Sequence, residues 1–313
     1  MDLIADIGAT NSRCALVDDR GRIRAYETFS DSDYSGVESL LETYFQQRCA
    51  DDHPRRAALA VAAPIVDDRV QMLNIDWQFS RAELKERFNL AELIVVNDFA
   101  AIAWGLPDLS SSDLRKVGRG DAATRSSMAV VGPGSGLGVA ALIPVTDSWS
   151  VVAGEGGHVS VSSTTSTEAA VADYVRSRSG HCSAEDLLSG PGLINIYNAL
   201  AQFTGRETPS VAPEEISAAA TSGDPLAIEA HATFFSLLGT VAGNLALTLD
   251  ARGGVFIAGG IIPDLMEPFA ESGFRKCFEA KGAYRNYMEA IPTYIITDPQ
   301  PAFGGLRKLL GYR

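Results

Sequence analysis

The sequence predicts an α/β protein of two domains, and three observations support this. The chain has 313 residues with 46% hydrophobic content, enough for a large core and more than most single domains contain. An unbroken apolar run over residues 93–96 leads directly into an alanine-rich helical stretch, a pattern typical of inner strands in a sheet covered by helices. After Pro107 the chain is rich in serine and charged residues up to Ser127, where a new apolar strand begins. We therefore place a domain boundary near residue 107.

The first domain is predicted to alternate strands with helices. Apolar residues recur at helical spacing over 36–48, and Ser80 and Glu83 have the spacing of a capping box that opens a helix over 80–88. Apolar runs bounded by turn residues predict the strands, over residues 3–7, 13–17, 23–29 and 57–62.

Asn97 and Asp98 come at the carboxyl end of the apolar run. In open α/β sheets, ligands bind at that edge, so the carboxylate of Asp98 is a candidate for contact with substrate. The alternative is that Asp98 is the N-cap of a helix over 99–104, with its side chain accepting a backbone N–H. This stretch alone leaves both interpretations open.

The loop Asp6-Ile7-Gly8-Ala9-Thr10-Asn11 joins one predicted strand to another. It is therefore a hairpin turn, whereas a Rossmann fingerprint or a P-loop must open a helix, and both of those nucleotide sites are excluded. Backbone N–H groups and the Thr10 hydroxyl in such a turn can point at a phosphate, with Gly8 allowing close approach. The alternative for this loop alone is an ordinary hairpin turn.

A second glycine hairpin opens the second domain. Predicted strands over 128–131 and 139–143 flank Gly132-Pro133-Gly134-Ser135-Gly136-Leu137-Gly138. This run does not match the dinucleotide fingerprint, the P-loop or the hydrolase elbow. Glycine hairpins in both predicted domains arise by chance less often than a single glycine hairpin does.

Two further stretches carry acids. Residues 154–158 place Glu155 and His158 among three glycines, and such glycine crowding indicates that a ligand or another backbone passes close, although a lone histidine is more often structural. The acid pair Glu185-Asp186 is by itself interpreted as charge at a helix start.

The remaining elements of the second domain follow from capping and periodicity. Thr165 and Glu168 have capping-box spacing for a helix over 165–178. Asp224-Pro225 opens a long helix with an apolar ridge, and residues 252–254 are expected to end it. A buried strand over 255–258 then runs into Gly259-Gly260, where a following helix can meet a nucleotide. A strand over 294–296 and a final helix over 303–310, packed back on the first domain, complete the chain.

Composition excludes several partners and compartments. The formal net charge of −13 disfavours nucleic acid and anionic membrane, since both require clustered Lys and Arg. No basic leader precedes the first strand, so we expect a cytoplasmic protein. The four cysteines are far apart and lack zinc-ligand spacing, so reduced thiols are expected.

Taken together, six motifs resemble the bacterial glucokinases. They are residues 6–11, 96–99, 134–138, 155–158, 188–192 and 258–260. The resemblance covers nearly the whole chain and implies the two-domain actin-like (ribonuclease H-like) sugar kinase fold, with sugar and nucleotide in an interdomain cleft. The implied domains are residues 1–107 plus 299–313 and residues 108–298. The zinc-binding cysteine cluster of the related ROK kinases does not occur in the sequence, which favours the branch without zinc.

The resemblance also implies the reaction. The γ-phosphoryl group of ATP, with Mg²⁺, would pass to the 6-hydroxyl of glucose, giving glucose 6-phosphate and ADP, with Asp98 as the base. Asp6 would orient the water shell of the metal, and a homodimer is implied only by the family. The implied sugar ligands are Asn97, Asp98, Glu155, His158 and Glu185. The implied nucleotide-binding residues are Asp6, Ile7, Gly8, Ala9, Thr10, Asn11, Gly134, Ser135, Gly136, Gly259 and Gly260.

One departure and two rival functions accompany this expectation. The first loop of the family usually reads Gly-Gly-Thr, and Ala9 replaces the second glycine, which would strain the loop if that position needs a positive φ. The nearest rival is a kinase of fructose, mannose or an N-acetylhexosamine. The other is a sugar-binding regulator without catalysis.

Overall fold

The computed structural model describes residues 1–313 except 50–52, 74, 208–210 and 313. The chain divides into two compact units. Unit 1 comprises Met1–Ser110, Val151–Gly154 and Asp298–Arg313, and unit 2 comprises Ser111–Ser150 and Glu155–Thr297.

Unit 1 is built on a five-stranded sheet with the order β3-β2-β1-β4-β7. Strands β1, β4 and β7 run parallel, while β2 and β3 extend the sheet as an antiparallel meander. A short hairpin of β5 and β6 lies outside this sheet. The strands are β1 (Asp2–Ile7), β2 (Asn11–Val17), β3 (Ile23–Ser30), β4 (Arg56–Val61), β5 (Arg69–Gln71), β6 (Gln78–Ser80) and β7 (Glu92–Asn97).

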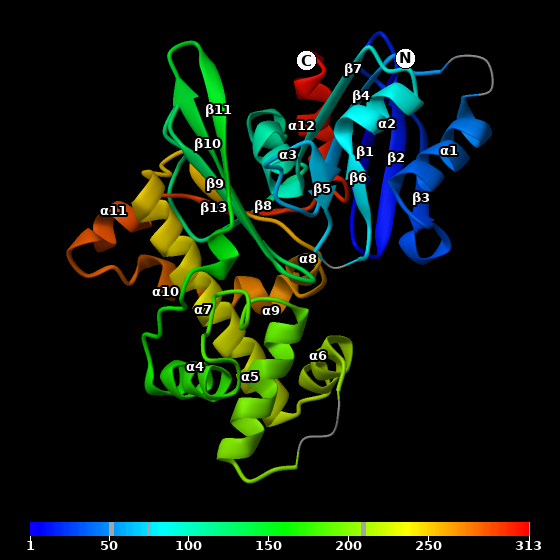
Figure 1. The fold of residues 1–313 in the computed structure, drawn as a ribbon. Coiled ribbons are helices and arrows are strands. Elements are labelled where there is room, and N and C mark those ends of the chain that lie inside the picture. Colours follow the sequence, from blue (N-terminus) through cyan, green and yellow to red (C-terminus); the bar gives the residue numbers. More distant parts are fainter. Residues whose placement is uncertain (50–52, 74, 208–210, 313) are drawn as a thin grey trace. The chain divides into compact units, whose positions relative to one another are not determined.

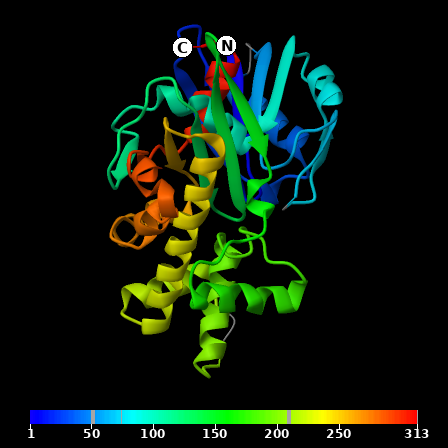
Figure 2. The ribbon, with the colours of Figure 1, turned by 90° about the vertical axis from the view of Figure 1, so that its left-hand side faces the viewer.

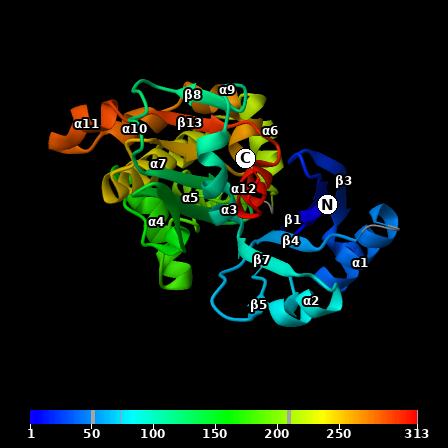
Figure 3. The same ribbon diagram turned by 90° about the horizontal axis from the view of Figure 1, so that it is seen from above.

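Helices cover both faces of this sheet. Helix α1 (Val37–Arg48) lies on one face, and α3 (Asp98–Gly105) and α12 (Pro301–Leu309) lie together on the other (Figure 3). The five apolar residues of α1 that the periodicity singles out, Val37, Leu40, Leu41, Tyr44 and Phe45, are all buried, as predicted. The shorter helices are η1 (Asp31–Asp33), α2 (Arg81–Arg87) and η2 (Leu106–Asp108).

The parallel register places the carboxyl ends of β1, β4 and β7 at one edge of the sheet. Ile7 is paired with Val61, and Val61 with Asn97. Since neighbouring strands lie about 4.8 Å apart, the loop after Ile7 and the residues after Asn97 come to the same edge, two strands apart.

The second sheet has six strands in the order β11-β10-β9-β12-β13-β8 and belongs to unit 2 except for residues Val151–Gly154 of β11. Strands β9, β12 and β13 are parallel to one another, β10 runs antiparallel to β9, and β8 runs antiparallel to β13. The strands are β8 (Leu114–Val117), β9 (Met128–Pro133), β10 (Leu137–Val145), β11 (Ser148–Gly154), β12 (Gly254–Ile257) and β13 (Thr293–Ile296).

The long helix α7 (Pro225–Leu249) is the centre of this unit, and helices surround it (Figures 1 and 2). Asp224 caps it by accepting the N–H groups of Leu226 and Ala227. The helices in contact with α7 are α4 (Ser166–Ser179), α5 (Gly190–Phe203), α6 (Pro213–Thr221), α10 (Phe274–Glu279) and α11 (Arg285–Glu289). Shorter turns are η3 (Gly156–His158), α8 (Ile261–Asp264), α9 (Met266–Ala270) and η4 (Gly282–Tyr284).

Helix α7 is also long and apolar enough to cross a membrane by length and composition alone. Within its most apolar window, however, 61% is buried inside the protein, and Phe234, Leu238 and Val241 belong to the core of the unit. Its apolar character is therefore that of a core helix.

The predicted elements are confirmed with two kinds of difference. Helix α7 ends at Leu249, before the predicted 252–254, because Asp250 takes the left-handed conformation (φ 49°) that glycine usually supplies. Strands β5, β6, β8 and β11 and helices α6, α9, α10 and α11 were not predicted. Helix α12 does pack back on unit 1, against α3, β1 and β4.

Candidate active site

The first candidate loop is confirmed as a hairpin between β1 and β2, with Ile7 paired to Ser12. A β-carbon on Gly8 would lie 2.5 Å from the backbone oxygen of Asn11, so the fold-back of the loop itself requires glycine there. Neither Gly8 nor Ala9 is among the described residues with positive φ. Ala9 therefore does not strain the backbone, and the Thr10 side chain at the tip is exposed.

Asp6 is the acid at the base of this hairpin. Its side chain is 22% exposed and lies 3.6 Å from the guanidinium of Arg13. Burial raises the pKa of Asp6 to about 6, and the nearby Asp31 adds to this rise, while Arg13 opposes it. At neutral pH the carboxylate is mostly ionised and partly open to solvent.

Asp31 lies behind the same hairpin and was not singled out from the sequence. Its backbone N–H donates to the Thr10 carbonyl at 3.0 Å, yet its side chain is almost fully buried. Both of its carboxylate oxygens and the buried Ser12 hydroxyl lack a hydrogen bond of proper geometry among the described residues. No local pattern marks Asp31, since its burial results from the fold of three strands.

Asn97 and Asp98 share the start of helix α3. The Asn97 Oδ1 accepts the N–H groups of Phe99 (3.0 Å) and Ala100 (3.2 Å). The alternative prediction that Asp98 is the N-cap is therefore wrong, because Asn97 is the N-cap. Asp98 is the first helical residue and accepts the Phe99 N–H at 2.9 Å with Oδ1.

The second glycine hairpin is confirmed between β9 and β10, with Pro133 paired to Leu137. The Gly134 N–H donates to the Gly136 carbonyl at 2.8 Å, which closes the turn and leaves Ser135 exposed at its tip. A turn of this kind presents backbone N–H groups and a hydroxyl to an anion.

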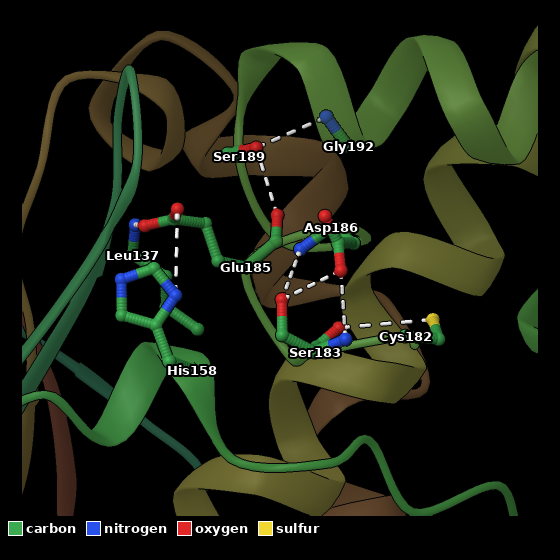
Figure 4. Close-up of polar contacts among 8 residues, drawn as sticks. All are labelled: Leu137, His158, Cys182, Ser183, Glu185, Asp186, Ser189 and Gly192. Atoms are coloured by element: carbon green, nitrogen blue, oxygen red, sulfur yellow. Dashed lines mark hydrogen bonds and ion pairs between the residues drawn. The ribbon is translucent and has the colours of Figure 1, made fainter. Parts of the chain in front are cut away.

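Glu185 connects this hairpin to the loop that carries His158 (Figure 4). Its Oε2 accepts the Leu137 N–H at 2.7 Å, and its Oε1 lies 3.9 Å from the His158 Nδ1. The Glu185 side chain is 32% exposed and that of His158 is 54% exposed. Both polar groups are thus held by unit 2 and still reachable by a ligand.

The glycines of the His158 loop allow a close approach of backbone, as their crowding predicted. A β-carbon on Gly157 would lie 2.2 Å from the Leu137 carbonyl, and one on Gly156 would lie 2.9 Å from Val139. The Gly157 carbonyl accepts the Glu185 N–H at 2.8 Å. Strand β10 and the segment around Glu185 therefore hold the loop between them, and Glu155 is exposed within it.

The interpretation of Glu185-Asp186 as charge at a helix start is wrong. Helix α5 begins at Gly190, and its cap is Ser189, whose Oγ accepts the Gly192 N–H at 3.0 Å. Asp186 instead closes a turn by accepting the N–H (2.7 Å) and the hydroxyl (2.8 Å) of Ser183. The two neighbouring acids thus differ in role, since only Glu185 reaches the hairpin.

The third glycine turn follows β12 and packs against the second hairpin. Gly259 has φ +82°, and a β-carbon there would lie 2.2 Å from the Pro133 carbonyl. Gly260 is exposed. The helix after this turn, α8, has only four residues. The predicted contact between a nucleotide and a helix N-terminus would therefore be with a helix of a single turn.

A divalent cation at this site would depend mainly on Asp6. Among the described residues, no three His, Cys, Asp or Glu side chains gather as a ready metal site. Mg²⁺ commonly binds through one or two carboxylates together with substrate phosphates. Asp6, a partly exposed carboxylate beside a hairpin suited to phosphate, fits that mode.

Comparison with known proteins places these features in a family. The glucokinase family model matches residues 3–311. The glucokinase of Paramagnetospirillum magneticum is 43% identical over 312 residues, which cover 99% of this chain and 97% of the relative. The chain belongs to the glucokinase family.

Solved structures of glucokinases agree with this assignment. The glucokinase from an Antarctic psychrotroph has a TM-score of 0.86 and 35% identity, with 98% of each chain covered. A ROK family glucokinase from Streptomyces griseus, solved with glucose and AMPPNP, has a TM-score of 0.67 at 20% identity and covers 98% of each chain. The two-domain actin-like fold of the sugar kinases is therefore the fold of this glucokinase-family chain.

Proposed function

We propose that this chain transfers the γ-phosphoryl group of ATP to the 6-hydroxyl of glucose, with Asp98 as the general base. The observation that carries the proposal is the register of β1, β4 and β7, which sets the Asp6–Asn11 hairpin and Asp98 at one edge of the sheet in unit 1. An anion-binding turn and a carboxylate at the same edge suit a phosphate and an attacking hydroxyl. Membership of the glucokinase family supports glucose and ATP as substrates.

The proposed chemistry assigns one step to Asp98. Its carboxylate accepts the proton of the 6-hydroxyl as the oxygen attacks the γ-phosphorus and the bond to the leaving ADP breaks. Phosphoryl transfer otherwise depends on positioning and charge neutralisation. Asn97 is already oriented by its cap bonds to α3, which leaves its Nδ2 group, 3.5 Å from the Ala63 carbonyl, the atom best placed to turn towards a sugar.

The remaining ligands are proposed by residue type and position. Glu155, His158 and Glu185 bind sugar hydroxyls, because carboxylates and an imidazole of suitable exposure hydrogen-bond them. The hairpins at residues 6–11 and 134–136 bind the phosphates, and Gly259-Gly260 borders the adenosine. Asp6 would orient the water shell of an Mg²⁺ ion held with the nucleotide, and that ion would neutralise phosphate charge.

Three further points remain part of this proposal. The described units change at Ser110 and Thr297, which supports domains of residues 1–107 plus 299–313 and 108–298. We also propose a cytoplasmic location, as the composition indicates, and a homodimer, as the family suggests.

The test is a coupled kinase assay of the purified chain over glucose, fructose, mannose and N-acetylhexosamines. We expect the highest kcat/KM for glucose, and Asp98→Asn is expected to lower kcat by roughly 10² to 10⁴ while glucose still binds. Glu92→Gln, at the opposite end of the same strand, is the control and should keep wild-type turnover. Near-wild-type turnover of Asp98→Asn would falsify the base assignment, and a higher kcat/KM for another hexose would replace glucose as the substrate.

A further inference from the structure

Glu185 makes its strongest contact with the backbone of the glycine hairpin. Its Oε2 accepts the Leu137 N–H at 2.7 Å, across 48 positions of sequence. A hydrogen bond from a backbone N–H to a carboxylate is among the stronger kinds in proteins. The residue that the family resemblance implies as a sugar ligand therefore also holds the first residue of β10.

Gly136 shows how closely the carboxylate and the hairpin are fitted. The three atoms nearest to a β-carbon at this position would all belong to the Glu185 carboxyl group, with Oε2 at 2.5 Å. Gly136 is not among the described residues with positive φ. A β-carbon here would therefore have to displace the Glu185 carboxylate, and no positive φ adds to this demand for glycine.

A second link fastens the same segment to the hairpin. The Gly190 N–H donates to the Gly134 carbonyl at 2.8 Å, and the Ser189 hydroxyl donates to the Glu185 carbonyl at 2.8 Å. The segment 185–190 therefore supports the hairpin at both Gly134 and Leu137. This leaves the Ser135 tip exposed on a turn whose two sides are fixed.

We propose that Glu185 is a positioning residue for the nucleotide, in addition to its role towards the sugar. One carboxylate oxygen fixes the Gly134–Leu137 turn in the shape that presents its N–H groups to phosphate, and the other faces His158 and the sugar loop. This rests on the proposed function for the identity of the two ligands. The turn is preorganised by a side chain from the sugar site, so the nucleotide is held even before sugar binds.

The test measures the Kd of Mg·AMP-PNP by calorimetry in the absence of sugar, where a residue that acts only on sugar has no effect. Glu185→Ala removes the acceptor and is expected to weaken binding roughly fivefold to fiftyfold, because a hydrogen bond to a charged group is lost. Glu185→Gln keeps an oxygen for the Leu137 N–H, so its nucleotide Kd should stay within about twofold of wild type while its KM for glucose rises. Glu155→Ala, which removes a different proposed sugar ligand, is the matched control and should leave the nucleotide Kd unchanged.

A double-mutant cycle with Gly136→Ala separates this contact from general damage. In the wild-type background the new β-carbon should displace the carboxylate and weaken AMP-PNP binding as much as Glu185→Ala does. In the Glu185→Ala background it meets no carboxylate and should add nothing, so the two effects are not additive. An unchanged Kd for Glu185→Ala, or additive effects in the cycle, would overturn the proposal.

These outcomes are independent of the reaction itself. If the purified chain bound AMP-PNP with the expected cycle but phosphorylated no hexose, the proposed function would fail and the role of Glu185 at the hairpin would stand. Thermal melting of each variant, with a Tm close to that of wild type, shows that the Kd values refer to folded protein.

Discussion

At the scale of single residues, Asp31 is a buried carboxyl group whose charge is only partly compensated by its surroundings. Its side chain is about 1% exposed, and neither oxygen has a hydrogen bond of proper geometry among the described residues. Burial raises the pKa of Asp31, although the Ser12 hydroxyl and Arg13 act in the opposite direction. An ionised carboxylate in such a place opposes folding.

We predict that Asp31→Asn stabilises the protein near neutral pH. A pKa raised on folding means that the folded state binds this proton more tightly than the unfolded chain does, so stability is lost as the pH rises through the folded pKa. Removing the charge should raise the free energy of unfolding by about 1–3 kcal/mol near pH 7.5. The gain should vanish as the pH falls below about 3, where the wild-type carboxyl group is protonated in both the folded and the unfolded state.

Urea unfolding at several pH values checks this prediction. Asp33→Asn is the control, because Asp33 belongs to the same 3₁₀ helix η1 and is exposed, so its removal should change the free energy of unfolding little at any pH. A gain for Asp31→Asn that is the same at every pH would show that charge is not its cause.

At the scale of elements, helices α3 and α12 meet through glycines. A β-carbon on Gly305 would lie 1.8 Å from the Ala101 carbonyl, and one on Gly105 would lie 3.0 Å from the Gly305 nitrogen. Gly304, the neighbour of Gly305 in the same helix, has more room, since its β-carbon would meet only the Gly105 Cα at 3.8 Å. A β-carbon would therefore clash at Gly305 but not at its neighbour Gly304.

We predict that Gly305→Ala and Gly304→Ala change stability in opposite directions. The first forces the two helices apart and should lower the free energy of unfolding by about 3 kcal/mol or more, at the upper end of overpacking effects. The second adds no clash and should raise it by up to about 1 kcal/mol, because alanine is the better helix former. Chemical denaturation of both variants gives the comparison, and a stable Gly305→Ala protein would contradict this packing of α12 on α3.

Among the helices and strands, the sequence predicts those with strong local signals and misses the shortest strands. Elements with strong periodicity or caps, such as α1 and α4 with its Thr165–Glu168 capping box, are predicted because their signals are local. Strands β5, β6 and β8 are missed because three or four residues carry too little pattern. Ala9 seemed a source of strain only because the sequence does not give φ.

In the candidate site, too, features with a local sequence signal were predicted and contacts between distant residues were not. Both hairpins were predicted from glycine between strands, and the strand-end position of Asp98 was predicted from its apolar run. The bond from the Leu137 backbone to Glu185 carries no sequence signal, since any residue but proline offers that N–H. The alternative that placed the N-cap at Asp98 is wrong by one residue, because Asn and Asp are equally good N-caps.

At the scale of the whole molecule, each unit has its own hydrophobic core. One cluster contains α1 and the sheet of unit 1, and the other contains α7 and the sheet of unit 2. The proposed sugar ligands are divided between them, with Asn97 and Asp98 in unit 1 and Glu155, His158 and Glu185 in unit 2. The proposed assignment of ligands therefore predicts that glucose stabilises both units.

We predict that glucose slows amide hydrogen exchange in both units. A ligand that binds only the native state raises the free energy of opening by about 2.7 kcal/mol at roughly 100 times its Kd, which corresponds to about a hundredfold slower exchange for amides whose opening releases the sugar. The affected amides should include Phe99 and Ala100, which donate to Asn97, and those of His158 and Glu185. The β5–β6 hairpin, which contains none of the proposed ligands, should be unaffected, and sorbitol at the same concentration should have no effect anywhere. Protection confined to unit 2 would show that Asn97 and Asp98 do not contact the sugar, and the base would then have to be sought outside α3.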